Sequence, residues 1–401
     1  MAGIFLVYLL AASCAAGFLL FRRNTVPREN GGVFRMNGQP SVIIPARNEE
    51  SNLPYLLGSL QVQSMEGLDL IVVDDYSEDR TRAIAESFGV NVIASPPLPP
   101  GWTGKNWAVT TGFKAAKGDI LIFLDADVRL APNSLFSLLA ARERMGGVLS
   151  VVPYHQTERF YERLSLIPNL LGLFAFTSPM ERRNPAQGLY GACIVATRED
   201  YERAGGHEGV KGELLDDLGL GARFREAGIA IHNYIGHGLV SFRMYPGGIR
   251  SELEGFSKGA VLSTSKLSPW TTLLVAIWLI GLAVSESAPF FLGTQWGIPL
   301  GIAYVLYTAQ IYYFVRYTGM FGRWLPAIHG ISTLFFLFVM LYSVIQVAFF
   351  GRVAWKGRAV QVGGKRGDGA GGKGRGDGGN SETKGTGETE AARDGTGRRP
   401  S

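Results

Sequence analysis

The sequence has 401 residues, enough for one large domain or two small ones, and hydrophobic residues make up 46% of it. Its mean hydropathy of +0.12 is high for a chain with a polar C-terminal tail, which excludes a fully disordered chain and argues against an ordinary soluble enzyme. A net charge of +5 does not indicate nucleic-acid binding, because the excess cations lie beside apolar runs, and two cysteines, Cys14 and Cys193, exclude a disulfide scaffold and a zinc site.

The N-terminal segment has the features of a membrane anchor. Residues 2–21 form one uncharged run that is long enough to cross about 30 Å of hydrocarbon, and Arg22, Arg23 and Arg28 follow it. With residues 1–22 as the anchor, the positive-inside rule then places the N-terminus outside and everything after Arg22 in the cytoplasm. A cleaved signal peptide fits less well, because the positive charge follows the apolar run and no A-x-A site ends it.

Residues 40–260 alternate short apolar runs with amphipathic stretches. This alternation predicts an α/β domain with a mostly parallel sheet that is covered by helices on both faces. Functional groups should then gather beyond the carboxyl ends of the strands. We expect strands at 41–45, 68–75, 90–95, 120–127 and 147–153, with helices at 49–61, 80–88, 107–116 and 132–145.

Residues 268–350 are again strongly apolar and are expected to form a C-terminal transmembrane region. We expect crossings near 270–292, 297–315 and 326–350, of which the first is interrupted by polar residues and can instead be re-entrant or interfacial. Charge does not decide the topology. Three crossings leave Arg352 outside, whereas the last two alone leave Arg316 there.

Two further segments complete the organisation. The apolar stretch 164–179 is broken by Pro168 and too short to span, which favours an interfacial helix or a lipid-facing lid. Residues 363–401 are rich in Gly and charged residues, cannot bury enough apolar surface to offset the entropy of ordering, and are expected to be a disordered tail.

Polar side chains follow the predicted strands. Asp125-Ala126-Asp127 ends the most apolar one, and carboxylates at i and i+2 lie on one side of a strand unless the chain turns between them. They can share Mg²⁺ or Mn²⁺, although a strand-end turn with two solvated aspartates would have the same sequence. Asp75 ends another strand, where it can accept hydrogen bonds from a base or a ribose, or simply precede a helix.

The end of the first predicted strand reads Pro45-Ala46-Arg47-Asn48-Glu49. Arg47 can face a nucleotide, and Glu49 suits the first turn of a helix. No GxGxxG follows this strand and no GxxxxGK[ST] occurs in the chain, so dinucleotide-binding and P-loop chemistry lose their usual support.

Two more motifs lie farther along the domain. The loop GWTGKNWA allows close approach to a ligand and carries Lys105, which suits a phosphate, although its tryptophans can equally serve as anchors. Asp216 and Asp217 precede a helix-like run. They suit helix capping, or a general base, which typically contributes about 10²–10⁴ in rate.

In this order these motifs resemble the family 2 glycosyltransferases, which have the GT-A nucleotide-sugar-binding fold. SVIIPARNEE is similar to the family's first strand, and VVDDYSEDRT to the segment whose nucleoside-binding aspartate falls on Asp75. The stretch ending in LDADV is similar to the metal-binding D-x-D, with Asp127 as direct ligand and Asp125 in support. ELLDDLGLGARF resembles the acidic element whose catalytic base falls on Asp217, beside Asp216.

The resemblance implies an inverting transfer, by single displacement, of a hexose such as glucose from a UDP-sugar, with Mg²⁺ or Mn²⁺ as cofactor. PPLPPGWTGKNWA, RMYPGGIRSELEGFSKG and WKGR are similar to members that glycosylate a carotenoid acid, and hopanoid-associated members share the GWTGK loop. No Q-x-x-R-W follows the base, which argues for a single transfer. The residues expected to bind the donor are Pro45, Ala46, Arg47, Glu49, Asp75, Lys105, Asp125 and Ala126.

The apolar segments suit a lipophilic acceptor that is dissolved in the bilayer and presented to a cytoplasmic active site of a multi-pass cell-membrane protein. Candidate acceptor contacts are Arg243, Tyr245 and Arg250, with Lys258, although cations beside a membrane also serve as interfacial anchors. Glycosylation of a hopanoid, a diacylglycerol or a polyprenyl phosphate is an alternative. A catalytically silent membrane scaffold is another, against which the set of Asp75, Asp127 and Asp217 argues.

Overall fold

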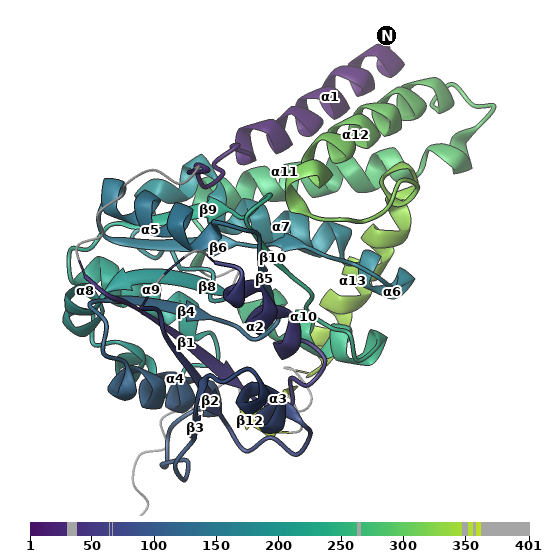
Figure 1. Cartoon of the computed structure of the whole chain (residues 1–401). Helices are drawn as coiled ribbons and strands as arrows, with labels where there is room; N and C mark the ends of the chain where they lie inside the picture. The colour runs from purple at the N-terminus through teal and green to yellow at the C-terminus, as the bar shows by residue number, and fades with distance from the viewer. Residues whose placement is uncertain are drawn as a thin grey trace, which may run out of the picture. The chain divides into compact units, whose positions relative to one another are not determined.

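The computed structural model describes residues 1–29, 38–63, 65, 67–262, 266–346, 352–355 and 358–361, without the side chains of 258–262 and of the residues after 346. Figure 1 shows how the elements are arranged. The expected tail at 363–401, the side chain of Lys258 and the last residues of the expected crossing 326–350 therefore lie outside what is described.

A seven-stranded sheet forms the centre of the α/β domain, in the order β3-β2-β1-β4-β8-β6-β9. Every neighbouring pair is parallel except the two that involve β8, which runs antiparallel to β4 and β6. The predicted mostly parallel sheet is confirmed, and β8 and β9 were not among the predicted strands. The strands are β1 Pro40–Ala46, β2 Asp69–Asp74, β3 Asn91–Ala94, β4 Ile120–Leu124, β6 Val148–Val152, β8 Cys193–Thr197 and β9 Ile231–Ile235.

Helices cover both faces of this sheet. On β1, Val42 and Ile44 belong to one buried cluster with the leucines of α2 and α5, whereas Ile43 belongs to the other, with residues of α4 and α9. The alternation follows from the two-residue period of a strand, whose successive side chains point to opposite faces. The helices are α2 Leu53–Gln61, α3 Thr81–Ser87, α4 Gly104–Ala115, α5 Ser134–Met145, α8 Arg198–Arg203 and α9 Asp216–Glu226, with the short η2 His207–Val210 before α9.

A second, three-stranded sheet extends the domain from the end of β4 toward the apolar helices. Its order is β5-β10-β7, and β10 is followed by the amphipathic helix α10. The elements in this region are β5 Val128–Leu130, β7 Tyr154–His155, α6 Phe160–Arg163, β10 Val240–Phe242 and α10 Ile249–Leu262; a separate hairpin is formed by β11 Arg352–Trp355 and β12 Arg358–Gln361.

Three described helices are long and apolar enough to cross a membrane: α1 Ala2–Leu20, α11 Pro269–Glu286 and α12 Gly297–Thr318. They pack through a buried polar network, in which Trp278 Nε1 donates to Gln310 Oε1 at 2.7 Å and Gln310 Nε2 donates to the Cys14 carbonyl at 2.7 Å. Such interhelical hydrogen bonds are typical of helices packed in lipid.

The last expected crossing differs from the prediction. In place of one segment over 326–350, the structure has η5 Leu325–Ile328 and the shorter helix α13 Gly330–Ile345, which contacts α10 and α7. Pro326 and Gly330 explain the break, because neither residue favours a continuous helix. Conversely, the first expected crossing, interrupted in sequence, forms the 18-residue helix α11, which includes Ser285 and Glu286 and ends before Ser287 and Pro289.

Helix α7 Leu166–Thr177 joins the two regions. Its helical structure is as expected, but the face formed by Leu170, Leu173 and Phe174 is buried in a cluster with residues of α1, α11 and α12. η1 Pro179–Arg183 follows it and contacts α1 and α11. This face of α7 is therefore part of a protein core rather than a lipid-facing lid.

Candidate active site

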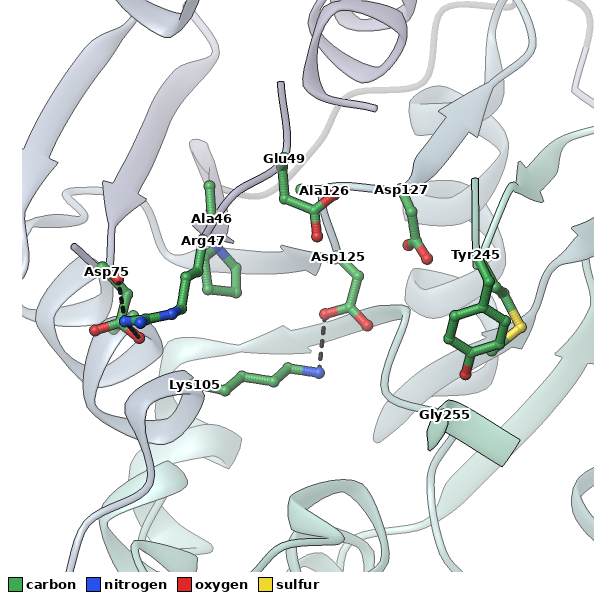
Figure 2. A pocket seen from close by; sticks show the side chains of 13 residues that line it. Ala46, Arg47, Glu49, Asp75, Lys105, Asp125, Ala126, Asp127, Tyr245 and Gly255 are labelled. Carbon is green, nitrogen blue, oxygen red and sulfur yellow. Dashed lines mark hydrogen bonds and ion pairs between the residues drawn. The ribbon is translucent and has the colours of Figure 1, made fainter. Parts of the chain in front are cut away.

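A cavity of about 220 Å³ opens at the carboxyl ends of β1, β2 and β4. This is the edge at which α/β sheets usually bind ligands. All eight residues expected to bind the donor line it, and so do Asp127 and Tyr245 (Figure 2). The lining residues are Pro45, Ala46, Arg47, Glu49, Asp75, Lys105, Ala108, Asp125, Ala126, Asp127, Met244, Tyr245 and Gly255.

Arg47 and Asp75 occupy one side of the cavity. The NH of Asp75 donates to the carbonyl of Ala46 at 2.8 Å, which brings the ends of β1 and β2 together. Arg47 Nη1 then donates to the Asp75 carbonyl at 3.0 Å and lies 3.9 Å from its Oδ2. Both side chains are mostly buried, so the hydrogen bond fixes the Asp75 backbone and keeps the guanidinium beside the Asp75 carboxylate at the cavity wall.

Asp125 and Asp127 lie in the turn that joins β4 to β5. The strand ends at Leu124, and the NH of Val128 donates to the Asp125 carbonyl at 3.1 Å, so the chain turns between the two aspartates instead of continuing as a strand. Both nevertheless face the same cavity, where Figure 2 shows their carboxylates directed into one space.

Lys105 reaches Asp125 from helix α4. The helix begins at Gly104 because the Thr103 side chain caps it by accepting from the Asn106 NH. The Lys105 ammonium lies 2.8 Å from Asp125 Oδ1 and 3.8 Å from Asp216 Oδ2. Burial alone would lower the pKa of Lys105, but the charges of Asp125, Asp216 and Asp217 raise it above its ordinary value, so this cation stays protonated.

Asp216 and Asp217 begin helix α9 at the border of the cavity, and neither is among its lining residues. Asp216 is buried between Lys105 and His207. The distance from Asp216 Oδ2 to His207 Nε2 is 3.9 Å. Asp217 Oδ2 accepts from the Gly191 NH at 3.3 Å. Burial raises the pKa of Tyr190 well above its ordinary value, and the charges of Asp127, Asp217 and Asp125 add to this shift.

The segment after β10 closes the cavity on its far side. Tyr245 and Met244 line it from this segment and Gly255 from α10, and a side chain at position 255 would collide with the Tyr245 ring. The sequence prediction missed Met244, Gly255 and Ala108. A glycine inside the amphipathic helix α10 was the available signal for Gly255, since such a position usually marks close packing.

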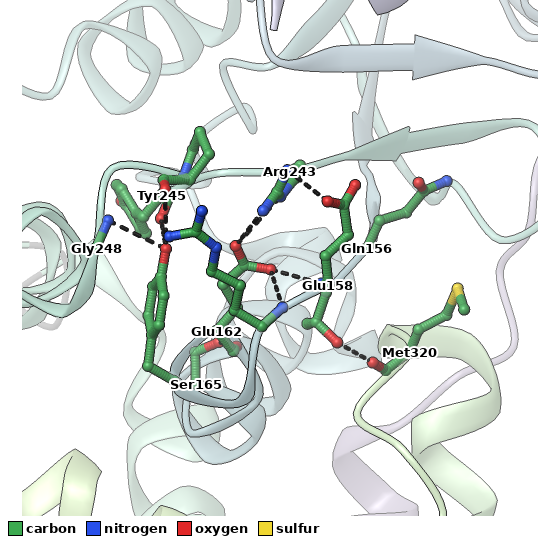
Figure 3. A network of polar contacts seen from close by, with 12 residues as sticks. Gln156, Glu158, Glu162, Ser165, Arg243, Tyr245, Gly248 and Met320 are labelled. Atoms are coloured by element: carbon green, nitrogen blue, oxygen red, sulfur yellow. Dashed lines mark hydrogen bonds and ion pairs between the residues drawn. The ribbon is translucent and has the colours of Figure 1, made fainter. Parts of the chain in front are cut away.

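The two arginines expected at the acceptor do not line the cavity. Arg243 is buried, its Nη2 lies 2.7 Å from Glu162 Oε1, and its Nη1 lies 2.8 Å from Glu158 Oε2 (Figure 3). Arg250 is exposed on α10, where it pairs with Glu254 at 3.0 Å. Arg243 therefore holds the β10–α10 segment in place, together with the Tyr161 hydroxyl, which donates to the carbonyl of Tyr245 at 2.9 Å.

The donor set of the cavity fits a hard divalent cation. No group of three or more His, Cys, Asp or Glu side chains placed to hold a metal is found among the described residues, and the two carboxylates of Asp125 and Asp127 line the cavity. Mg²⁺ is usually bound in this way, by one or two carboxylates with substrate phosphates and water completing the shell. The Lys105 contact neutralises part of the Asp125 charge.

The sequence matches a family of known activity. The model of glycosyl transferase family 2 matches residues 41–205. The chain belongs to this family and is a glycosyltransferase. The 4,4'-diaponeurosporenoate glycosyltransferase of Staphylococcus haemolyticus (strain JCSC1435) is 34% identical over 333 residues, which cover 80% of this chain and 88% of that protein. The enzyme of the same name from Staphylococcus aureus (strain MRSA252) is 31% identical over 369 residues, 89% of this chain and 97% of that protein.

Solved structures are also similar. The mannosyltransferase PcManGT from Pyrobaculum calidifontis, in complex with GDP-Man and Mn²⁺, is 16% identical with a TM-score of 0.48, covering 87% of this chain and 99% of that one. Glucosyl-3-phosphoglycerate synthase from Mycobacterium tuberculosis, in complex with Mn²⁺, UDP and glucosyl-3-phosphoglycerate, is 27% identical with a TM-score of 0.35, covering 58% of this chain and 80% of that one. The family predicted from motif order is thus confirmed by the full-length relatives.

Proposed function

We propose that this glycosyltransferase moves glucose from UDP-glucose onto the carboxylate of a carotenoid acid such as 4,4'-diaponeurosporenoate, by a single inverting displacement. The observation that carries the proposal is the cavity at the ends of three parallel strands, where Asp75, Lys105, Asp125 and Asp127 meet. Relatives named for this acceptor match along nearly their whole length, which supports the acceptor class.

In this proposal the donor lies across the strand ends. Asp75, held by Arg47, accepts hydrogen bonds from the uracil or the ribose, and the Lys105 ammonium binds the phosphates. A divalent cation held by Asp127, with Asp125 in support, would stabilise the negative charge of the departing diphosphate. The position of Asp125 is fixed beforehand by its contact with Lys105, so the chain spends little free energy on ordering it when the donor binds.

The acceptor chemistry sets how much the base contributes. A carboxylic acid is already ionised near neutral pH, so its oxygen can attack the anomeric carbon while the bond to the diphosphate oxygen breaks. Asp217, with Asp216 beside it, then orients the acceptor more than it removes a proton. A hydroxyl acceptor would need Asp217 to take its proton in full.

The test is a transfer assay with the purified full chain, Mn²⁺ and a matrix of donors and acceptors. We expect product from UDP-glucose and the carotenoid acid, and little from its methyl ester, which blocks the attacking oxygen. Product only with a hopanoid, a diacylglycerol or a polyprenyl phosphate would replace the acceptor. No product with any pair, combined with no binding of UDP, would favour the silent scaffold.

We further propose that α1, α11 and α12 cross the cell membrane and that α13 does not. The N-terminus then lies outside, and the catalytic domain and the residues after α12 lie in the cytoplasm. This arrangement puts Arg22, Arg316, Arg323 and Arg352 on the cytoplasmic side and leaves the uncharged link 287–296 outside, which satisfies the positive-inside rule. It also agrees with the contacts of α13, whose Ser332 and Ser343 hydroxyls bond to the carbonyls of Leu164 and Ser257.

Labelling with a membrane-impermeant maleimide tests this topology. In intact cells we expect Thr294→Cys, in the link between α11 and α12, to react, and Lys211→Cys, exposed in the catalytic domain, to react only after permeabilisation. Reaction of both positions in intact cells, or of Lys211→Cys alone, would contradict the proposed orientation. Both native cysteines are buried, so they add little background.

A further inference from the structure

A second cavity, of about 320 Å³, lies away from the proposed active site. Strands β4, β6 and β9 run in the same direction, so the first residues of β9 lie at the end of the sheet opposite to Asp125. The two cavities share no lining residue. The second is lined by Asn24, Met145, Phe176, Thr177, Ser178, Arg182, Gln187, Arg225, Ala230, Ile231, His232 and Asn233.

The charge of this cavity is positive. Arg182, Arg225 and His232 line it, and no aspartate or glutamate does. Among the described residues, no ion pair is found for either arginine. Burial lowers the pKa of His232, and the charges of Arg182 and Arg225 lower it further, as expected where cations face one another without a counter-ion.

The Arg225 guanidinium is held in place by neutral partners. Arg225 Nη2 donates to the Arg182 carbonyl at 3.3 Å and to the Gln187 side-chain oxygen. Amide and hydroxyl groups also line the cavity, among them those of Asn24, Thr177 and Ser178. Carbonyl partners orient a guanidinium without cancelling its charge, so the positive potential of the cavity stays available to an anion.

The cavity also lies where the catalytic domain meets the apolar helices. Asn24 follows the end of α1, and its side chain donates to the Asn233 carbonyl at 2.7 Å. On the other side, η1 carries Arg182 and contacts α1, and Ser268, the cap of α11, donates to Glu181 of η1 at 3.0 Å. If α1 and α11 cross the membrane as proposed above, this cavity is at the level of the lipid headgroups.

We propose that this second cavity binds a phosphate group, supplied by the headgroup of an anionic phospholipid or by a free phosphate. Paired guanidinium groups recognise phosphate oxygens through charge-assisted hydrogen bonds, and the amide and hydroxyl groups complete the set of donors. The volume exceeds that of a phosphate alone and leaves room for the glycerol part of a headgroup. Cations near a membrane surface favour anionic lipid.

The experiment uses the purified full chain in detergent, with native mass spectrometry for phosphatidylglycerol and phosphatidylcholine and thermal shift for inorganic phosphate. The Arg182→Gln/Arg225→Gln variant removes both guanidinium groups. Arg183→Gln is the matched control, because Arg183 is the exposed neighbour of Arg182 on η1 and does not line the cavity. UDP binding in the presence of Mn²⁺ is measured on every variant, which separates this site from the proposed donor site.

We expect the wild type and Arg183→Gln to bind one of the two anions, and the double variant to bind it at least about tenfold more weakly. A preference of at least tenfold for phosphatidylglycerol over phosphatidylcholine identifies a lipid headgroup, and binding of inorganic phosphate without that preference identifies a free phosphate. If the double variant also loses UDP binding, the single variant Arg182→Gln replaces it in the test, because the Arg182 side chain is exposed. This single variant must then show the loss of anion binding. The proposal would be overturned if the wild type bound neither anion, or if the double variant and Arg183→Gln bound the anion equally well.

Discussion

Lys105 and Asp125 form an ion pair with 2.8 Å between Nζ and Oδ1, which ties the first turn of α4 to the turn after β4. The same ammonium lies 3.8 Å from Asp216 Oδ2 at the start of α9. One cation therefore sits between the carboxylate proposed to support the metal and the helix that carries the proposed base. It also lines the cavity in which a donor diphosphate would lie.

Lys105→Met should weaken donor binding. The change removes a charge-assisted contact to the phosphates worth about 1.5–3 kcal/mol, so kcat/KM for UDP-glucose should fall about tenfold to a hundredfold. Lys114→Met is the control, because Lys114 lies on the same helix, 5.6 Å from the centre of the Trp107 ring and outside the cavity. Unchanged kinetics in Lys105→Met would remove Lys105 from the donor site.

Asp217→Asn should affect acceptors differently according to their chemistry. Turnover of a hydroxyl acceptor should fall by about 10²–10⁴, because a proton must be removed, whereas a carboxylate acceptor should lose less than about tenfold. The asparagine can still accept from the Gly191 NH, so the local fold is kept. Glu226→Gln, exposed on the same helix, is the control. Equal losses on both acceptors would count against an orienting role.

Arg243→Met should act on stability. Glu162 is only 2% exposed, and removing Arg243 leaves its charge buried without the arginine, a change that typically costs about 3–5 kcal/mol. Arg250→Met, on the exposed end of α10, should change the free energy of unfolding by less than about 0.5 kcal/mol. Denaturant unfolding in detergent measures both. A stable Arg243→Met with a raised KM for the acceptor would instead restore Arg243 as an acceptor contact.

Glu252 should make stability depend on pH. Burial raises the pKa of Glu252 to about 8. The hydrogen bond with the Ser165 side chain lowers this pKa, and the charge of Glu162 raises it further. The folded protein therefore binds this proton more tightly than the unfolded chain, whose pKa is about 4.3. Its contribution is fully present below pH ~4.3 and is lost as the pH rises to about 8.

The matched variant isolates this effect. Glu252→Gln cannot ionise, so it should gain about 3–5 kcal/mol over the wild type between pH 5 and 9. The measurement is the midpoint of thermal unfolding at pH 5, 7 and 9 for both proteins. Parallel pH profiles would show that Glu252 does not carry the dependence.

Much of the proposed donor site was predictable because its residues follow strands with strong local signals. β1, β2 and β4 are continuous apolar runs, and parallel strands bring their carboxyl ends to one edge whatever the details of packing. Arg47, Asp75 and Asp125 therefore could be placed at one cavity before any coordinates. The roles assigned to these residues stay predictions.

The remaining features depend on contacts between distant segments. β8 runs antiparallel between β4 and β6, and nothing in CIVAT specifies that direction. Arg243 resembles a membrane-facing cation in sequence, because Glu162 is 81 residues away. Likewise, Tyr245 and Gly255 form a wall of the cavity only because α10 folds back over the strand ends.

Binding of UDP with and without Mn²⁺, by calorimetry on the full chain and on Asp127→Asn, tests the central claim most directly. The account predicts that the wild type binds UDP with Mn²⁺ and that either a chelator or Asp127→Asn weakens this binding at least about tenfold. Tight UDP binding that neither the chelator nor the substitution changes would contradict a donor held through Asp127 in this cavity. No binding by the wild type would contradict it as well.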